Sequence, residues 1–257
     1  MKALTDTRLL FNRYGLQMVR NPVWVFVGLS TPLLYLVLFT PLLNSVSGRS
    51  ASSGFSASGR AIDGFLPGIL ALLAFASGSG PGFNTIFELQ AGVIERFRVT
   101  PASRTAILLG PIFFATVAMF VFDIALVAVG AAFGFHIHLG GLLILAVLLG
   151  LLMIMTAAFS IATAVATGDI SGFAAIINGM NLPVLLLGGV LLPISLGPTW
   201  LRVLAHFDPL YYLVEAARAL SAGNLATTAT WQAFAVLTPL TILTVAWATN
   251  VFRRAVA

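Results

Sequence analysis

Few side chains of this 257-residue chain could carry out catalysis or hold a metal ion. The chain has no cysteine, so it offers neither a thiolate ligand nor a thiol nucleophile. His136 and His138 could form a metal-binding pair, but zinc sites use three or four ligands and no third one lies nearby in the sequence. The only lysine is Lys2 and no Gly-x-x-x-x-Gly-Lys pattern occurs, so the sequence has no P-loop for ATP. We therefore expect no catalytic, cofactor or metal site in this chain alone.

One carboxylate differs from the others because it falls deep inside an apolar stretch. Asp123 lies within residues 106–133, far from either end of that stretch. A charge inside a bilayer is costly and usually faces the protein interior. Asp123 could be a polar element of a transport path or a proton relay, or it could hydrogen-bond to a neighbouring helix or reach the outer interface. A similar choice stays open for Asn178, Asn181 and Pro183. They could line a transport path or gate, or the two asparagines could form interhelical hydrogen bonds and the proline could kink its helix.

The composition determines the kind of element that positions these side chains. Hydrophobic residues make up 59% of the chain and charged residues 8%, and the mean hydropathy is +1.03. A soluble domain has about 25% charged residues, so this composition excludes a soluble protein and a disordered one. Strands of a transmembrane barrel would alternate polar and apolar residues in segments of about 10, and no such segments occur. The predicted class is all-α, a polytopic membrane protein.

Six apolar stretches are long enough to cross about 30 Å of hydrocarbon. They cover residues 22–43, 64–87, 106–133, 139–167, 172–194 and 230–252. If both termini are cytoplasmic, nine of the 13 basic residues lie inside, as the positive-inside rule requires. The sequence therefore predicts six transmembrane helices in a single transmembrane domain over 1–257, with cytoplasmic termini.

Residues 1–21 form a polar, basic segment before the first span. Phe11, Tyr14 and Met18 fall on one helical face, whereas Arg13 and Arg20 fall on another. This pattern is typical of an amphipathic helix that lies in the headgroup plane. The alternative is a basic leader that only sets the topology.

The most polar stretch inside the chain is the cytoplasmic segment 88–105. Leu89, Val93 and Phe97 make one apolar stripe, while Glu95 and Arg98 can pair on another face, so we expect a short amphipathic helix. The residue before a proline avoids the helical region, so this helix should stop near residue 99, before Thr100 and Pro101. A helix held there could dock into a groove on a soluble partner, or it could be a solvated or headgroup connector.

The sequence of residues 194–226 predicts two short helices at the external face and no membrane span. Pro198 and Trp200 open the first helix, and Asp208 with Pro209 caps and starts the second. Helices this short fit a re-entrant or interfacial hairpin, and aromatic residues such as Tyr211 favour the headgroup level. Because helix capping accounts for Asp208, we do not assign His206 and Asp208 to a Ser/His/Asp catalytic set.

Particular residues of these segments and of the fifth span are specific in combination. They are Glu88, Gly92, Glu95, Arg96, Thr100, Pro101, Ser103, Arg104, Asn181, Pro183, Gly189, Pro193, Pro198, Trp200, Leu201, Pro209, Leu210, Glu215 and Arg218. With these residues the sequence resembles the membrane subunits of ATP-binding-cassette exporters of the ABC-2 type, close to the permeases of daunorubicin-resistance-type drug and lipid exporters. The resemblance covers nearly the whole chain, including the six-span layout.

This resemblance implies an ATP-driven exporter in which two permeases each bind a soluble ATPase subunit, which holds ATP and Mg²⁺. The segment that starts at Glu88 would be the coupling helix. Its implied coupling residues are Glu88, Leu89, Gly92, Val93, Glu95, Arg96, Phe97, Arg98 and Pro101. The substrate would be hydrophobic or amphipathic, a drug, lipid or glycolipid, and the location a bacterial cell membrane.

Two other classes remain open at this point. A gradient-driven secondary transporter or channel would need an ion or proton site near the midplane, for which Asp123 is the strongest candidate. An intramembrane enzyme or a structural scaffold would instead show turnover, or assembly without flux, in liposomes that hold this chain alone.

Overall fold

The computed structural model of the chain describes residues 11–16, 18, 20, 22–47, 61–92, 104–136, 138–190, 194 and 197–256. Within these residues every regular element is helical and no strand occurs, which confirms the predicted all-helical class. Residues 11–16 form a short helix. The longer helices are α2 (Pro22–Ser47), α3 (Ala61–Ser77), α4 (Gly80–Gln90), α6 (Arg104–Ala132), α7 (Leu139–Thr167), α8 (Ile170–Leu187), α9 (Thr199–Ala205), α10 (Pro209–Ser221) and α11 (Thr228–Val256).

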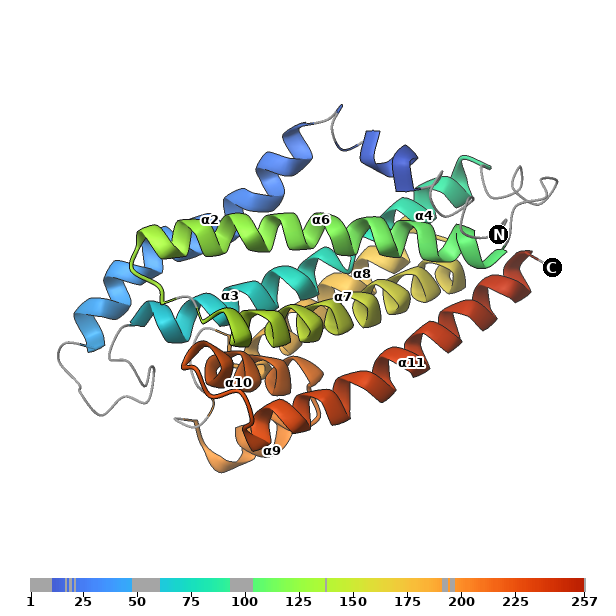
Figure 1. Ribbon diagram of the computed structural model, residues 1–257. Helices are drawn as coiled ribbons and strands as arrows, with labels where there is room; N and C mark the ends of the chain where they lie inside the picture. Colours follow the sequence, from blue (N-terminus) through green and yellow to red (C-terminus); the bar gives the residue numbers. More distant parts are fainter. Residues whose placement is uncertain are drawn as a thin grey trace.

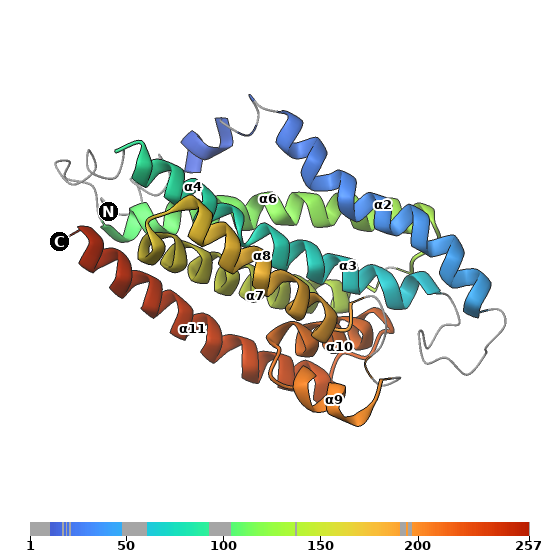
Figure 2. The ribbon, with the colours of Figure 1, turned by 180° about the vertical axis from the view of Figure 1, so that it is seen from behind.

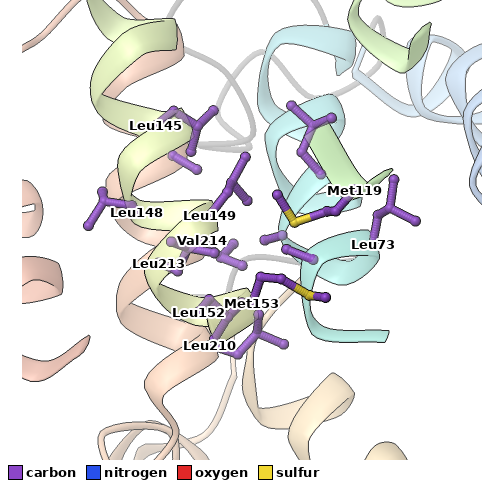
Figure 3. Close-up of a cluster of buried hydrophobic side chains, with 14 of the residues drawn as sticks. Leu73, Met119, Leu145, Leu148, Leu149, Leu152, Met153, Leu210, Leu213 and Val214 are labelled. Carbon is purple, nitrogen blue, oxygen red and sulfur yellow. The ribbon is translucent and has the colours of Figure 1, made fainter. Parts of the chain in front are cut away.

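The core of the bundle is built around α7. Its sequence is almost entirely Leu, Ile, Met, Val, Ala and Gly, and a helix that is apolar on all sides is buried by its neighbours. Helices α11, α4, α10 and α3 pack against it. In Figure 3, leucine and methionine side chains of α7 meet Leu210, Leu213 and Val214 of α10. Leu73 of α3 and Met119 of α6 complete this cluster.

Five described segments are long and apolar enough to cross a membrane. They are Ile62–Gln90, Leu108–Ala132, Leu139–Thr167, Ile170–Leu187 and Thr228–Arg254. They correspond to the second to sixth predicted spans. The first predicted span, 22–43, corresponds to α2, whose apolar stretch among the described residues, Val25–Phe39, is shorter. The fold is thus that of a polytopic membrane protein with α2 as a further apolar helix.

The second predicted span is not one continuous helix. It consists of α3 and α4, which are separated by a turn at Gly78 and Ser79. Pro81 stands in the first turn of α4, the only part of a helix in which proline costs no hydrogen bond. The predicted span over 64–87 therefore lies within the candidate span Ile62–Gln90, but the sequence did not predict the break in its helix.

The fifth predicted span ends earlier than its hydrophobicity indicates. Helix α8 begins after Asp169, whose carboxylate accepts a hydrogen bond of 2.8 Å from the Gly172 N–H. It ends at Leu187, and Gly189 has a positive φ of 64° that most other residues would not adopt. The predicted boundary at residue 194 was therefore too late.

Different helices gather at the two ends of the bundle (Figures 1 and 2). Helices α9 and α10 lie at one end, together with the start of α11. The end of α4, the short helix 11–16 and the end of α11 lie at the other. We refer to these as the hairpin end and the Glu88 end.

Candidate functional site

Glu88 is the centre of a charged cluster at the Glu88 end. It lies in the last turn of α4, and its carboxylate accepts a hydrogen bond from the Tyr14 hydroxyl that is shared between Oε1, at 3.1 Å, and Oε2, at 3.2 Å. The Arg13 guanidinium forms an ion pair with Oε1 at 3.0 Å. A largely buried carboxylate needs charge-assisted partners of this kind. The short helix 11–16 is thereby tied to α4.

Aromatic packing holds the short helix in place on α6. The Phe11 ring lies 6.0 Å from the Phe113 ring and 5.6 Å from the Phe114 ring, between centroids. The Tyr14 ring stacks on Phe114 at 6.1 Å. Helix 11–16 therefore contacts two spans, α6 through its aromatic rings and α4 through Glu88.

Tyr14 is a permanent donor in this cluster. Burial is the main cause that raises its pKa, the Glu88 charge raises the pKa further, and Arg13 opposes both. The hydroxyl therefore keeps its proton at any pH at which the protein would be studied. The sequence placed Tyr14 on the apolar face of an amphipathic helix, but it gave no signal for a partner 74 residues away.

The structure assigns Glu88 and Leu89 to α4 and not to a separate helix. The Ala91 N–H bonds to the Phe87 carbonyl, and Gly92 then takes a positive φ of 68°, which ends the helix. The prediction that a new helix starts at Glu88 was therefore wrong. The other implied coupling residues lie outside the described residues: Val93, Glu95, Arg96, Phe97, Arg98 and Pro101.

Arg218 is the centre of a second cluster, at the hairpin end. Its Nε donates to the Gly64 carbonyl at 3.3 Å and its Nη2 to the Gly189 carbonyl at 2.7 Å. Its Nη1 pairs with Glu215 Oε1 at 3.2 Å. One mostly buried guanidinium thus joins the start of α3, the chain after α8, and α10. We call this the Arg218 clasp.

Close backbone packing accompanies the Arg218 clasp. A Cβ at Gly68 would lie 2.8 Å from the Val190 carbonyl oxygen, so α3 and the chain after α8 approach more closely than a larger residue permits. The Ser221 hydroxyl donates to the Asp63 carbonyl at 3.0 Å. The hairpin end is therefore a fixed assembly of α3, α8 and α10.

The turn between α6 and α7, which contains His136, is also tied to α3. The His136 N–H donates to Asp63 Oδ1 at 3.3 Å, and its Nδ1 lies 3.7 Å from Asp63 Oδ2. This pairing gave no signal in the sequence. No group of three or more His, Cys, Asp or Glu side chains that could hold a metal occurs among the described residues.

Asp208 caps α10, as its position before Pro209 predicts. Its Oδ1 accepts a hydrogen bond of 3.0 Å from the Leu210 N–H, while Oδ2 is buried without a hydrogen-bond partner among the described residues. Burial raises the pKa of Asp208 to about 6, although the Leu210 hydrogen bond opposes the shift. Asp208 thus titrates much nearer neutrality than an exposed aspartate.

Large apolar side chains are exposed on and beside α9. The helix follows Pro198, and Trp200 on α9 and Phe207 just after its end leave 64% and 82% of their surface exposed. The Tyr211 ring packs on the His206 ring at 5.3 Å. Pro193 lies outside the described residues.

The candidate path residues do not form one site. Asp123 is 5% exposed on the buried face of α6 that also carries Met119, and neither carboxylate oxygen has a hydrogen-bond partner among the described residues. Asn178 is exposed and Asn181 half-buried on α8, which packs on α7, α10, α4 and α9. Pro183 lies inside α8, one turn before its end. Asp123 and the α8 residues therefore belong to different surfaces.

Comparisons with known proteins agree over most of the chain. The family described as ABC-2 type transporter matches residues 5–221. A protein from Cyanophora paradoxa named "Putative transport permease ycf38" is 30% identical over 214 residues, 82% of this chain and 72% of the relative. Proteins of the same name from Pyropia yezoensis and Porphyra purpurea are each 27% identical to this chain. Each match covers 84% of this chain, and 74% and 73% of the two relatives. The family match includes both clusters.

Proposed function

This chain belongs to the ABC-2 type transporter family, and from that premise we propose that it is the permease subunit of an ATP-driven exporter. Members of this family work in a lipid bilayer with a separate ATPase subunit. Permease subunits of the family are generally not catalytic. The ATPase would therefore bind ATP and Mg²⁺, and this chain would form the transport path.

The proposed topology has six spans, with α2 as the first and both termini in the cytoplasm. Helix α2 has 26 residues, enough at 1.5 Å per residue to cross the hydrocarbon. Arg253 and Arg254 end α11 at the Glu88 end, where Arg13 also lies. The resemblance to bacterial exporters supports a bacterial cell membrane, whereas the three relatives come from algae.

The observation that carries this proposal is the link between Glu88 and the short helix 11–16. Glu88 stands at the end of a span, directly before the segment 93–103 that would contact the ATPase. Its side chain points to Tyr14 and Arg13, so it acts within the permease. When the ATPase moves the coupling segment, the motion would reach α4 first and the interfacial helix through Glu88. Glu95 and Arg96, in the segment itself, would contact the ATPase.

A second permease would cover the exposed face of α8. Asn178 and Met180 are exposed there, and Asn181 is half-buried. An amide side chain facing lipid would lack hydrogen-bond partners, whereas a facing helix of a second copy can supply them. Such an arrangement would place the path between the two copies, with Pro183 and α2 near it.

The substrate would be a hydrophobic or amphipathic molecule that enters sideways from the bilayer. Within α6, α7 and α8, Asp123 is the one charged residue that lies away from the helix ends. A path for a soluble ion or sugar would need more polar lining than these helices supply. A drug, lipid or glycolipid fits this chemistry best.

Co-purification tests the proposal. The chain would be co-expressed, with an affinity tag, together with an ATP-binding-cassette ATPase of the same genome, and the ATPase retained per permease would be measured in detergent. Arg96→Gln should lower the retained ATPase because it removes a charge from the coupling segment. Arg254→Gln, an exposed charge at the same end of the bundle, is the matched control and should change nothing. An intact chain that retains no ATPase would contradict the proposal.

One observation favours a second candidate function. Asp123 is buried without a described hydrogen-bond partner, which is the feature expected of a proton or ion site in a gradient-driven transporter. Transport that follows a proton gradient in the absence of any ATPase and is lost in Asp123→Asn would establish this alternative. Transport that needs ATP and survives in Asp123→Asn would exclude it.

A further inference from the structure

The break between α3 and α4 leaves backbone groups that need partners inside the membrane. The first N–H groups of any helix lack acceptors in their own helix. In hydrocarbon, each such group left unsatisfied is costly. The residue at the N-cap position of α4, Ser79, does not help because its hydroxyl donates backward, to the Ala76 carbonyl at 2.7 Å. The start of α4 therefore depends on another element.

Ser160 of α7 supplies the missing partner. Its hydroxyl oxygen accepts a hydrogen bond of 3.1 Å from the Gly82 N–H, in the first turn of α4. The same hydroxyl lies 2.7 Å from the Gly78 carbonyl, where it donates across the break, and 2.9 Å from the Ala157 carbonyl of its own helix. Ser160 is 1% exposed. A single side chain thus contacts both sides of the break.

Glycines allow α7 to come this close. A Cβ at Gly78 would collide with the Thr156 side chain. A Cβ at Gly82 would lie 2.6 Å from the Phe173 ring and 2.7 Å from the Ser160 carbonyl. These neighbours leave no space for an alanine at residue 78 or residue 82. The close approach of α7 therefore requires glycine at both positions.

On the Glu88 side of the break, α4 packs against α7, α6 and α8. Ile86 of α4, Ala164 of α7 and Phe173 of α8 form a separate buried cluster. The Phe83 and Phe173 rings meet edge to face at 4.8 Å. Above the break, α3 is held by the Arg218 clasp at the hairpin end. The break therefore separates two differently anchored halves of one span.

We infer that Ser160 is a positioning residue that caps α4 from α7 and sets the direction of the inner half of span two. As a result the position of α4, which carries Glu88, is set by its contact with α7 and not by α3, the helix that precedes it in the chain. Only the effect on transport, described last, rests on the proposed function. The cap itself is a property of the permease alone.

Distances between spin labels test the cap without an ATPase. The chain has no cysteine, so Asn84→Cys on α4 and Asn224→Cys at the hairpin end give two exposed labelling sites. Ser160→Ala should broaden and shift the distance distribution between the labels, because α4 loses its cap. Thr163→Ala is the matched control and should leave the distribution unchanged, since among the described residues the Thr163 hydroxyl donates to the Phe159 carbonyl of its own helix. A Ser160→Ala distribution that coincides with that of Thr163→Ala would overturn the inference.

If Ser160→Ala does not fold, Ser160→Cys replaces it. A thiol is a weaker donor and acceptor, and at this buried position it stays out of reach of the labelling reagent. Ser160→Cys should broaden the distribution less, and an unchanged distribution would overturn the inference in this case too.

A second readout uses the complex with its ATPase. Transport of a fluorescent phospholipid per ATP hydrolysed should fall about fivefold in Ser160→Ala, the factor that corresponds to one lost hydrogen bond, at unchanged ATPase binding. If the unmodified chain binds no ATPase, the proposed function fails, and the label distances alone decide on Ser160.

Discussion

At the scale of single residues, Tyr14 and Arg13 account for the burial of Glu88. A carboxylate at this depth is stable because three polar contacts, between 3.0 and 3.2 Å, reach it from one short helix. Sequence patterns predicted the helix and its apolar face, since both are local. They did not predict the cluster, because nothing local relates Tyr14 to a residue 74 positions later.

Removal of the Tyr14 hydroxyl tests this cluster. Tyr14→Phe keeps the ring on Phe114 but leaves Glu88 with one donor fewer, which should cost about 1 to 3 kcal/mol of stability. Thermal unfolding of the purified protein would measure the loss. Tyr212→Phe, whose exposed hydroxyl donates to the His206 carbonyl, is the control and should change stability by less than about 0.5 kcal/mol. Equal effects of the two substitutions would contradict the assigned role of Tyr14.

Asp208 predicts a pH dependence with a definite sign. Its pKa rises from 3.8 to about 6 on folding, so the folded state holds the proton more tightly. The stabilising contribution of the protonated form is present at low pH and is lost as the pH rises through about 6.

Asp208→Asn should remove this dependence. Asparagine caps a helix as well as aspartate does and carries no charge. The free energy of unfolding of the variant, relative to that of the unchanged protein, should therefore be up to about 3 kcal/mol higher at pH 7 than at pH 4. Unfolding midpoints of the two proteins at several pH values between 4 and 7 would show it. A variant that loses stability at pH 7 would speak against the burial of a charged Asp208.

At the scale of elements, the sequence predicted some boundaries well. The apolar run 139–167 coincides with α7, and Asp208 before Pro209 marks the start of α10. These succeed because hydrophobic length and capping chemistry are local properties. The break in span two was missed because its hydrophobicity continues through it, although Gly78, Gly80, Pro81 and Gly82 are a signal that could have indicated it.

The Arg218 clasp joins three elements, and its geometry requires arginine. Lysine has one ammonium group and cannot reach the Gly64 and Gly189 carbonyls and Glu215 from separate nitrogens. Arg218→Lys should therefore lower the unfolding temperature by several degrees, which corresponds to about 2 kcal/mol for a lost buried contact. Arg202→Lys removes an exposed arginine that bonds to the Gly197 carbonyl and serves as the control. A clasp variant as stable as this control would show that the elements hold together without Arg218.

At the scale of the whole molecule, the exposed helix faces indicate what surrounds the chain. The exposed α6 face that carries Ile124 is purely apolar, as lipid requires, and the exposed α11 residues around Ile242 are mostly apolar but include Thr238. The exposed α8 face, in contrast, includes the amide of Asn178. The sequence alone did not predict this difference, because it does not indicate which side of α8 is exposed.

Cross-linking distinguishes the two kinds of face. In the cysteine-free chain, Asn178→Cys should give oxidised dimers in membranes, because the proposed second copy packs on α8. Ile242→Cys, exposed on α11, should remain monomeric on a denaturing gel. Dimers formed through residue 242 and not through residue 178 would contradict the proposed arrangement.

The most direct measurement is the rate of ATP hydrolysis by the partner ATPase in lipid nanodiscs, with and without this chain. We predict that the chain changes the rate, and that Glu88→Gln abolishes this change while the ATPase stays bound, because the link to Tyr14 and Arg13 is weakened. An ATPase rate that is the same with and without the chain would contradict an ATP-driven permease coupled through the Glu88 end.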